Sequence, residues 1–313
     1  MGQAPVVSLT WDRRVPARCA TVKSFTGLQR SKQPMPDRYA VIGHPIAHSK
    51  SPLIHGLFAQ ATGQDMTYEM IDGGAEPGGF DRALASFRTA GGRGLNVTLP
   101  FKLQALAAAT QASDDARLAG AANALRFDGD RIEAQNFDGI GLVRDIEHNL
   151  GLPLTGKRVL LLGAGGATRG ALLPLARAGV ARLVLANRTA AKATGLARQA
   201  APHLGGCVVE GGGLADLTAS DTFDLVINAT SSSLSGEAPA VPASAFASAA
   251  LAYDMVYGKG LTPFLKAAQA ARCTRVADGV GMLVEQAAEA FAWWRGVRPD
   301  TRDVLARLTV PLV

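Results

Sequence analysis

Apolar and polar positions along the chain form two kinds of pattern from residue 38 onward. Short apolar runs bounded by turn residues predict strands, and stretches with apolar residues three and four positions apart predict helices. The predicted strands of the first half are residues 38–43, 67–72 and 94–98, and its predicted helices are residues 52–62, 77–90, 100–109 and 138–150. Residues 122–127 and 131–136 flank the turn Asp128-Gly129-Asp130 and predict a hairpin.

A second series of strands follows the turn-rich segment Gly151-Leu152-Pro153. Helices separate these strands, and two further helices end the chain. The predicted strands are residues 159–163, 182–186, 223–229 and 251–255, and the final helices are residues 279–294 and 300–308. Continuous apolar strands that alternate with helices predict parallel sheets covered on both faces. We therefore expect two α/β domains, with the final helices packing back on the first.

The composition predicts a folded chain without a membrane-spanning helix. At roughly 150 residues per domain, the 313 residues correspond to about two domains, and 48% of them are hydrophobic. The longest apolar runs, residues 159–167 and 223–229, have the length of strands. They fall short of the roughly 20 residues that a spanning helix requires.

The positive charge is concentrated at the N-terminus. The net charge of the chain is +6, and residues 1–36 contribute +5 of it. The rest of the chain is almost neutral and contains no base-reading module, so we expect no nucleic-acid partner. The N-terminal segment has no sustained hydrophobic period, which predicts a disordered leader. Alternatively, the start of the chain is assigned too early and Met35 is the true first residue. An Arg-rich transit peptide is the alternative.

Three cysteines, Cys19, Cys207 and Cys273, are odd in number and far apart, with no metal-ligand spacing. This arrangement is typical of a protein in a reducing compartment, where free cysteines serve as small apolar side chains. The expected location is therefore cytoplasmic.

A glycine-rich turn joins the strand at residues 159–163 to a helical segment. Gly163, Gly165 and Gly166 permit a tight turn and a close approach of the backbone to a pyrophosphate at the helix N-terminus. The pattern departs from G-x-G-x-x-[GA] because Thr168 occupies the third small position. Since a strand precedes the turn and a helix follows it, we interpret the segment as the dinucleotide site of a Rossmann-type doubly wound domain.

The end of the next strand indicates which dinucleotide binds. Enzymes that use NAD usually place an acidic residue there to hold the ribose 2′-hydroxyl. This chain has Asn187-Arg188-Thr189, followed by Lys192. Arg188 offers a planar fork for a 2′-phosphate, so NADP(H) is the expected cofactor. Alternatively, Arg188 is a solvated loop residue.

Histidines and serines gather before the first predicted helix. His44, His48 and His55 have irregular spacing and no partnered carboxylate or cysteine, so we expect no metal site. Ser49 and Ser51 precede a helix N-terminus, where their hydroxyls either cap the helix or face a polar ligand. The sequence alone favours the cap.

Several other polar residues have an ordinary interpretation when each is taken alone. Pro100 predicts the first turn of a helix after the strand at residues 94–98, which places Lys102 just after the junction. Most lysines are solvated, and Asp138 fits a helix N-cap. Asn123, Tyr257 and Gln286 fit packing positions.

Taken together and in order, the motifs resemble those of the shikimate dehydrogenase family. The resemblance covers the chain from about residue 39 to its end and leaves the N-terminal segment unmatched. The motifs are PIAHSKSP, NVTLPFK, GAANAL, NFDG, GAGGA, NRT, INATSS, YDMVYG and ADGVGMLVEQA.

The resemblance implies an NADPH-dependent reduction of 3-dehydroshikimate to shikimate, in a cleft between a substrate domain and an NADP domain. It implies that Lys102 and Asp138 form the catalytic pair. The residues implied to bind the substrate's carboxylate and hydroxyls, besides that pair, are Ser49, Ser51, Asn96, Thr98, Asn123, Tyr257 and Gln286. The residues implied to bind NADP(H) are Gly163, Ala164, Gly165, Gly166, Ala167, Asn187, Arg188, Thr189, Lys192, Met255 and Gly279, with Asp114 as a weaker candidate.

Three positions depart from the family pattern. Phe137 stands where a threonine is usual beside the catalytic aspartate, Gln135 where an acidic residue is common, and His44 where asparagine is common. None of these changes removes a reacting group. Phe137 puts in doubt one polar contact near the substrate, or the shape of the pocket floor.

The expected organisation has four segments. They are a leader at residues 1–36, a substrate domain at 37–138, an NADP-binding domain at 139–279 and C-terminal helices at 280–313. A small-molecule substrate is the expected partner, with no membrane, and a homodimer is a possible assembly. The first alternative is a quinate/shikimate dehydrogenase with broader substrate or NAD use, and a remote one is a non-catalytic NADP-binding sensor.

Overall fold

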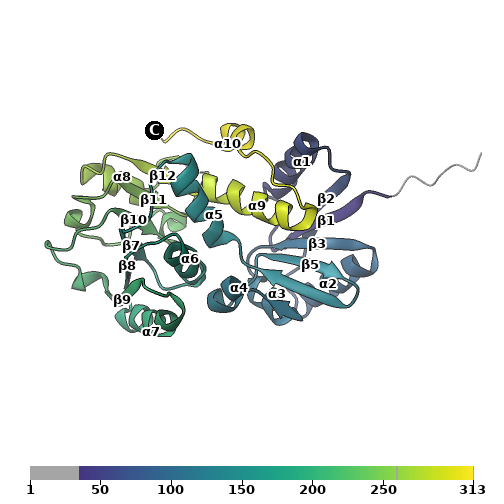
Figure 1. Ribbon diagram of the computed structural model, residues 1–313, viewed down its shortest axis with the longest axis horizontal. Coiled ribbons are helices and arrows are strands. Elements are labelled where there is room, and N and C mark those ends of the chain that lie inside the picture. The colour runs from purple at the N-terminus through teal and green to yellow at the C-terminus, as the bar shows by residue number, and fades with distance from the viewer. Residues whose placement is uncertain (1–34, 259, 313) are drawn as a thin grey trace, which may run out of the picture. The chain divides into compact units, whose positions relative to one another are not determined.

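The protein is described by a computed structural model at residues 35–258 and 260–312 (Figure 1). All but the last two residues of the predicted leader lie outside this range. Two six-stranded sheets form within the described residues, one from the first half of the chain and one from the second. The expected α/β fold with two sheet domains is confirmed.

The first sheet is mixed, because the predicted hairpin at residues 122–127 and 131–136 is present and forms part of it, where the alternation of strands and helices predicted a parallel sheet. Strand β1 runs parallel to β2 and β3, whereas β5 is antiparallel to both β3 and β6. The reason is the short turn Gly129-Asp130 between the paired residues Asp128 and Arg131, since a two-residue connection can join only antiparallel strands. In the order β2-β1-β3-β5-β6-β4, the strands are β1 (Asp37–Gly43), β2 (Met66–Asp72), β3 (Gly92–Val97), β4 (Gln111–Ala112), β5 (Ala124–Asp128) and β6 (Arg131–Gln135).

Four helices accompany this sheet: α1 (Ser51–Thr62), α2 (Gly79–Thr89), α3 (Lys102–Ala107) and α4 (Asp114–Ala119). The expectation that Pro100 begins the third helix is wrong. Pro100 lies in a turn in which the Phe101 backbone N–H donates to the Thr98 carbonyl over 3.0 Å, and the Leu99–Pro100 peptide bond is cis. The helix begins at Lys102, so this lysine occupies its first position.

The second sheet is entirely parallel, with the order β12-β11-β10-β7-β8-β9. This is the doubly wound order of a Rossmann-type domain, as expected. Strands β9 and β12 escaped prediction because one is rich in glycine and the other has only three residues. The strands are β7 (Arg158–Leu162), β8 (Arg182–Asn187), β9 (Val208–Gly213), β10 (Leu225–Asn228), β11 (Leu251–Asp254) and β12 (Val276–Asp278).

Alternate residues of the central strands face two separate cores. Leu161 and Ile227 pack in one apolar cluster, while Leu160 and Val226 pack in another on the opposite face. Both faces of the sheet are thus buried, which explains the continuous apolar runs. The helices are α5 (Asp138–Arg144), which continues as a π-helical turn (Asp145–Asn149), α6 (Gly166–Arg177), α7 (Ala190–Ala200), a 3₁₀ turn (Ala201–His203), α8 (Pro263–Ala270), α9 (Val280–Arg295) and α10 (Arg302–Leu308).

Helix α9 links the second half of the chain to the first. It runs alongside α5 and reaches α1, where Ile54 and Phe58 pack against Val284 and Phe291 (Figure 1). All four of these side chains are fully buried. The position of α9 therefore depends on elements from both halves.

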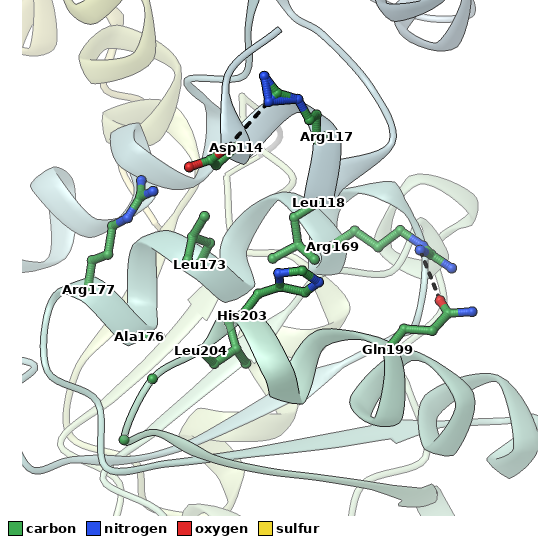
Figure 2. Close-up of a pocket in the computed structure, with 12 residues that line it drawn as sticks. Asp114, Arg117, Leu118, Arg169, Leu173, Ala176, Arg177, Gln199, His203 and Leu204 are labelled. Atoms are coloured by element: carbon green, nitrogen blue, oxygen red, sulfur yellow. Dashed lines mark hydrogen bonds and ion pairs between the residues drawn. The ribbon is translucent and has the colours of Figure 1, made fainter.

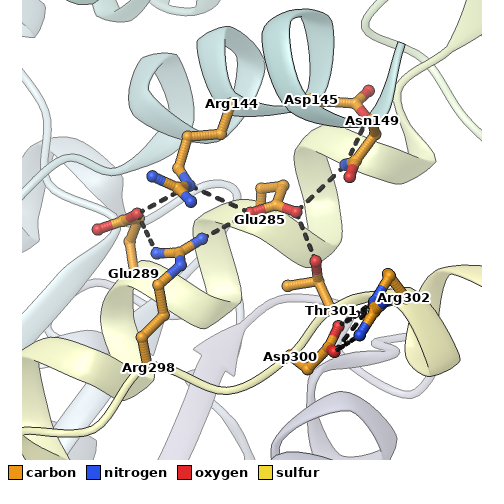
Figure 3. A network of polar contacts seen from close by, with 9 residues as sticks. All are labelled: Arg144, Asp145, Asn149, Glu285, Glu289, Arg298, Asp300, Thr301 and Arg302. Carbon is orange, nitrogen blue, oxygen red and sulfur yellow. Dashed lines mark hydrogen bonds and ion pairs between the residues drawn. The ribbon is translucent and has the colours of Figure 1, made fainter. Parts of the chain in front are cut away.

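A buried carboxylate fixes α9 further. Glu285, whose side chain is 3% exposed, accepts hydrogen bonds from Thr301 (2.7 Å), Arg298 (2.6 Å) and Asn149 (3.1 Å), as Figure 3 shows. Arg144 on α5 approaches the same carboxylate at 3.4 Å. A buried charge is tolerated when it is paired and fully hydrogen-bonded. The network joins α5, α9 and the segment before α10, directly beside Gln286.

Helices α5 and α9 approach closely at Gly141. A Cβ atom at this position would lie 2.7 Å from the Gln286 backbone nitrogen and 2.8 Å from the Met282 carbonyl oxygen. We expect Gly141→Ala to lower the free energy of unfolding by about 1–3 kcal/mol, because backbone atoms cannot yield as a flexible side chain would. Thermal unfolding followed by circular dichroism measures this change.

Gly195 in α7 is the matched control, because a Cβ there would meet nothing within 4 Å. We expect Gly195→Ala to raise the stability by about 0.5–1 kcal/mol, as alanine does in an open helical position. Equal effects of the two substitutions would contradict the close contact of α5 with α9.

Candidate active site

Lys102 and Asp138 form an ion pair between the first residues of two helices. The Lys102 Nζ lies 2.6 Å from the Asp138 Oδ2, and the side chains are 27% and 19% exposed. Phe137 takes the N-cap position, so the interpretation of Asp138 as an N-cap is wrong. As the first residue of α5, Asp138 places its carboxylate at the positive end of the helix dipole. The pair is partly shielded from water and reachable from it.

Asn123 connects this pair to α9. Its Nδ2 donates to the Asp138 Oδ1 over 2.8 Å and to the Gln286 Oε1 over 3.1 Å. Its Oδ1 accepts from the Phe137 backbone N–H over 2.9 Å, which fixes the orientation of the amide. Asn123 is 3% exposed. Residues from α3, α5, α9 and the start of β5 are therefore joined by one set of hydrogen bonds.

Asn96 at the end of β3 belongs to a neighbouring set. The Tyr68 hydroxyl donates to the Asn96 Oδ1 over 2.6 Å, and the Asn96 Nδ2 lies 3.4 Å from the Asn123 carbonyl oxygen. Desolvation raises the pKa of Tyr68 well above its usual range, so its hydroxyl stays protonated and acts as the donor. Tyr68 thus leaves the Asn96 NH₂ group as the part that can donate elsewhere.

His55 on α1 stacks against Tyr68, with ring centroids 4.2 Å apart and planes inclined by 6°. The imidazole is fully buried, and burial lowers its pKa to about 3, so it is neutral at ordinary pH. Among the described residues neither ring nitrogen has a hydrogen-bond partner. His55 is therefore an aromatic support for Tyr68.

The remaining substrate candidates lie around these two sets or before α1. The Ser49 hydroxyl accepts from the Ser51 backbone N–H over 3.3 Å, although Lys50 is the N-cap of α1. Thr98 lies two residues after Asn96, and its backbone carbonyl accepts a hydrogen bond from the Phe101 backbone N–H. Tyr257 follows β11, is 42% exposed, and has its pKa raised by desolvation and then by the negative charge of Asp138.

The unexpected Phe137 points into the protein core. Its side chain is 6% exposed and packs with Ala124, Ala290 and Trp293, the last in an edge-to-face contact with centroids 5.8 Å apart. Only the backbone N–H of Phe137 contacts the site, through Asn123. The Phe137 side chain therefore packs beneath the site and makes no hydrogen bond to it. His44, another of the three departures, pairs with Asp72 at 2.7 Å, a carboxylate partner that the sequence did not reveal.

The glycine turn lies between β7 and α6. Gly163 has a φ of 108°, which strongly favours glycine, and its N–H donates to the Ala186 carbonyl at the end of β8 over 2.8 Å. A Cβ at Gly165 or Gly166 would meet nothing within 4 Å, so the N-terminus of α6 is open. The Thr168 hydroxyl donates to the Gly163 carbonyl over 3.0 Å, which explains a threonine at the third small position. This arrangement fits a bound pyrophosphate.

The other cofactor candidates lie at the same edge of the second sheet. Asn187 ends β8 and donates to the Thr189 carbonyl over 3.0 Å, while Arg188 and Lys192 are exposed at the start of α7. Met255 follows β11, and its N–H donates to the Asn228 carbonyl at the end of β10 over 3.0 Å. The remaining candidates fall in two places: Ala164 and Ala167 within the glycine turn, and Gly279 beside the Met255 carbonyl.

Asp114 lies elsewhere. It begins α4, its side chain is 76% exposed, and it pairs with Arg117 at 3.5 Å. The structure does not bring it to the glycine turn through any hydrogen bond within the described residues.

The part of the chain that the structure describes contains neither a cluster of metal-ligating side chains nor a membrane-spanning helix. It holds no group of three or more potential metal-ligating side chains, and no helix there is long and apolar enough to cross a bilayer. Cys207 and Cys273 are free and buried, and burial raises the pKa of both thiols.

Comparison with known proteins identifies the family. Residues 41–125 match the shikimate dehydrogenase substrate binding domain, residues 145–238 match shikimate / quinate 5-dehydrogenase, and residues 279–309 match the shikimate 5'-dehydrogenase C-terminal domain. A shikimate dehydrogenase (NADP(+)) of Aromatoleum aromaticum is 55% identical over 272 residues, which cover 87% of this chain and 96% of that protein. The chain belongs to the shikimate dehydrogenase family.

Solved structures of similar proteins agree with this assignment. An Ael1 enzyme from Pseudomonas putida is 56% identical, with a TM-score of 0.83 over 88% of this chain and 100% of that one. Shikimate 5-dehydrogenase from Thermus thermophilus, in complex with NADP(H) and shikimate, is 32% identical, with a TM-score of 0.73 over 87% and 100%. The family and the fold class expected from the sequence are confirmed.

Two further residues of the candidate site were assigned no role from the sequence. Tyr68 lies in an ordinary strand pattern, and Asn136 belongs to the motif NFDG but was not singled out within it. Asn136 is 2% exposed, accepts from the Asp138 N–H over 3.1 Å and donates to the Ala121 carbonyl over 3.0 Å. Both residues act on predicted site residues, and only spatial proximity reveals them.

We expect Tyr68→Phe to raise the KM for shikimate by about 2- to 10-fold, the range that corresponds to one lost hydrogen bond. Without the hydroxyl, the Asn96 amide can rotate and present its oxygen in place of its NH₂ group. The KM for NADP⁺ should not change. Tyr39→Phe on β1 removes a hydroxyl that only Arg295 contacts, over 3.4 Å, and is the control. Equal shikimate KM values for Tyr68→Phe and the unaltered protein would contradict the role of Tyr68.

Proposed function

We propose that this protein catalyses the reversible NADPH-dependent reduction of 3-dehydroshikimate to shikimate, with Lys102 and Asp138 as the catalytic pair. The observation that carries the proposal is the 2.6 Å contact of this pair, joined through Asn123 to Gln286. Membership in the shikimate dehydrogenase family supports both the reaction and the cofactor, since relatives such as the Aromatoleum aromaticum protein are named for NADP(+).

In the reduction, NADPH when bound supplies a hydride to the carbonyl carbon of the substrate. The electron pair of the C=O bond moves to the oxygen, which needs a proton as its negative charge develops. The Lys102 ammonium is the group placed to donate that proton. Asp138 holds Lys102 by its Oδ2 and is itself held by Asn123 at its Oδ1. Lys102 regains a proton from water, and the reverse sequence oxidises shikimate.

We propose that the polar residues around the pair bind the substrate's carboxylate and hydroxyls. Hydroxyl groups and amides suit these groups because each can donate or accept a hydrogen bond. The proposed set, which lies in the substrate domain apart from its last two members, is Ser49, Ser51, Asn96, Thr98, Asn123, Tyr257 and Gln286.

The cofactor would lie along the carboxyl edge of the second sheet, at the glycine turn of residues 163–167. In the doubly wound fold, ligands bind outside the carboxyl ends of the strands, where the strand order reverses. That reversal falls between β7 and β10. Arg188 and Lys192 at the exposed start of α7 would hold the 2′-phosphate, and Met255 and Gly279 would line the nicotinamide end.

The proposed domains are a substrate domain at residues 37–138 and an NADP domain at 139–279, with the helices at 280–313 returning to the first. A cytoplasmic location is supported by the free thiols of Cys207 and Cys273. A homodimer is the assembly to test, by light scattering of the purified protein.

A four-way kinetic comparison tests the proposed function. Shikimate and quinate are each oxidised with NADP⁺ and with NAD⁺, and kcat/KM is measured for every combination. We expect the highest value for shikimate with NADP⁺. A preference for quinate or for NAD⁺ would favour the quinate/shikimate dehydrogenase alternative. The family that residues 145–238 match is described by both substrates, as shikimate / quinate 5-dehydrogenase. No activity in any combination would favour a non-catalytic NADP-binding protein.

A further inference from the structure

A second site lies between α4, α6 and the turn that follows α7. It is a pocket of about 710 Å³, and Figure 2 shows its lining side chains. None of the substrate candidates and no residue of the glycine turn lines it, and Asp114 is the one cofactor candidate that does. Apart from Asp114, the pocket shares no residue with the site of the proposed reaction.

One face of α6 sets the pattern of this pocket. Arg169, Leu173 and Arg177 are four residues apart along the helix, so they share one face. At 1.5 Å of rise per residue, the two arginines start about 12 Å apart, with the leucine halfway. Figure 2 shows the arginines at opposite ends of the pocket, with Leu173 and His203 between them. The face therefore presents a cation, an apolar centre and a second cation.

The rest of the lining, from α4 and from the turn after α7, also combines basic and apolar side chains. Helix α4 contributes Arg117 and Leu118, and the turn after α7 contributes His203 and Leu204. The leucines of the two walls supply the apolar centre, and the arginines stand at its margins. An elongated ligand would be covered by carbon in its middle and by guanidinium groups at its ends.

Two of the three arginines of the pocket are only weakly paired, whereas Arg177 forms a short ion pair with a buried carboxylate. Arg169 contacts Gln199 at 3.5 Å, and Arg117 contacts Asp114 at 3.5 Å across an exposed pair, which is worth little. Arg177 pairs with the Asp115 carboxylate at 2.6 Å through one nitrogen, yet its side chain is 52% exposed. A guanidinium has five N–H donors, so Arg177 can bind Asp115 and an incoming anion together. The three arginines exceed the carboxylates of Asp114 and Asp115 by one positive charge, and Arg169 is the arginine without a carboxylate partner among the described residues.

We propose that this pocket binds an elongated small molecule with a carboxylate or phosphate group at each end and an apolar middle. One end would lie against Arg169 and the other against Arg177, with the middle on Leu173 and the facing leucines. Such a ligand would bridge α4 and α6, which belong to the two halves of the chain. The proposal does not depend on the reaction that the protein catalyses.

Binding of linear dicarboxylates of increasing length tests the proposal. Titration calorimetry of the full chain, with NADPH present in excess, is carried out from butanedioate to dodecanedioate. We expect decanedioate, whose carboxylates lie about as far apart as the Cα atoms of Arg169 and Arg177, to bind about tenfold more tightly than decanoate, the contribution of one further hydrogen bond to a charged group. A bisphosphonate of the same length distinguishes the two anionic groups, and binding of either supports the site. Absence of any advantage of the dicarboxylate over decanoate overturns it.

Single substitutions locate the binding. Arg169→Ala and Arg177→Ala should each remove the advantage of the second carboxylate, whereas Arg198→Ala on the exposed face of α7 should preserve it. Arg177→Ala leaves the buried Asp115 without its partner and can unfold the protein. Arg169 has no carboxylate partner in the described structure, so its variant keeps the test decisive. An unchanged preference in Arg169→Ala contradicts the proposal.

Discussion

Lys102→Ala is expected to lower kcat for shikimate oxidation by about 10²- to 10⁴-fold, the usual contribution of a positioned acid or base. The KM for shikimate should change little, because the proton transfer matters in the transition state and much less in the bound ground state. The ion pair with Asp138 places the ammonium where it can serve this step. Steady-state kinetics with NADP⁺ in excess measures both constants.

Lys266→Ala, which removes an exposed amine from α8, is the control and should retain full activity. Binding of NADPH, followed by its fluorescence, should be the same in both variants. Asp138→Asn keeps the hydrogen bond with Asn123 but removes the charge that holds Lys102, so it should also lose most of its kcat. Near-normal turnover in Lys102→Ala would remove this residue from the mechanism.

Arg188→Ala is expected to raise the KM for NADPH by about 10- to 100-fold and to leave the KM for NADH nearly unchanged. A hydrogen bond to a charged group contributes about 1.5–3 kcal/mol, and only NADPH carries the 2′-phosphate. Arg188 is exposed at the start of α7, beside the end of β8. The reduction of 3-dehydroshikimate with each cofactor measures the difference.

The matched control for this experiment is Arg198→Ala, also exposed but near the opposite end of α7. It removes the same charge from the same helix and should affect neither cofactor. If Arg188→Ala raises both KM values equally, the 2′-phosphate assignment is wrong, and Arg188 contributes through general electrostatics.

The sequence predicted most of the elements because their signals are local. The apolar runs of β7, β10 and β11 and the glycine turn of α6 are contained within segments of a few residues. The hairpin of β5 and β6 was predicted from its turn, but its antiparallel pairing with β3 was not, because that pairing joins strands far apart in the sequence. The start of α3 was misplaced by two residues, since Pro100 closes a turn as readily as it begins a helix.

The candidate site could be predicted from the sequence only because its motifs resemble those of the shikimate dehydrogenase family. Each member alone had an ordinary interpretation, and several of them are exposed or partly exposed. The structure changed the interpretation of Phe137 from a doubtful pocket residue to a core residue packed on Trp293. It also added Tyr68 and Asn136, whose roles depend entirely on their neighbours.

The sequence by itself determined the doubly wound domain, the glycine turn, the preference for NADP(H) and the family. These depend on the order and spacing of residues along short stretches, which a linear pattern records. Tertiary structure supplied the contacts themselves: Lys102 meets Asp138, its partner in the pair that the resemblance implied, from 36 positions away, and Asn123 meets Gln286 from 163 away. The physical reason is that each pair joins separate elements, α3 with α5 and the start of β5 with α9, and the packing that brings such elements together has no local period.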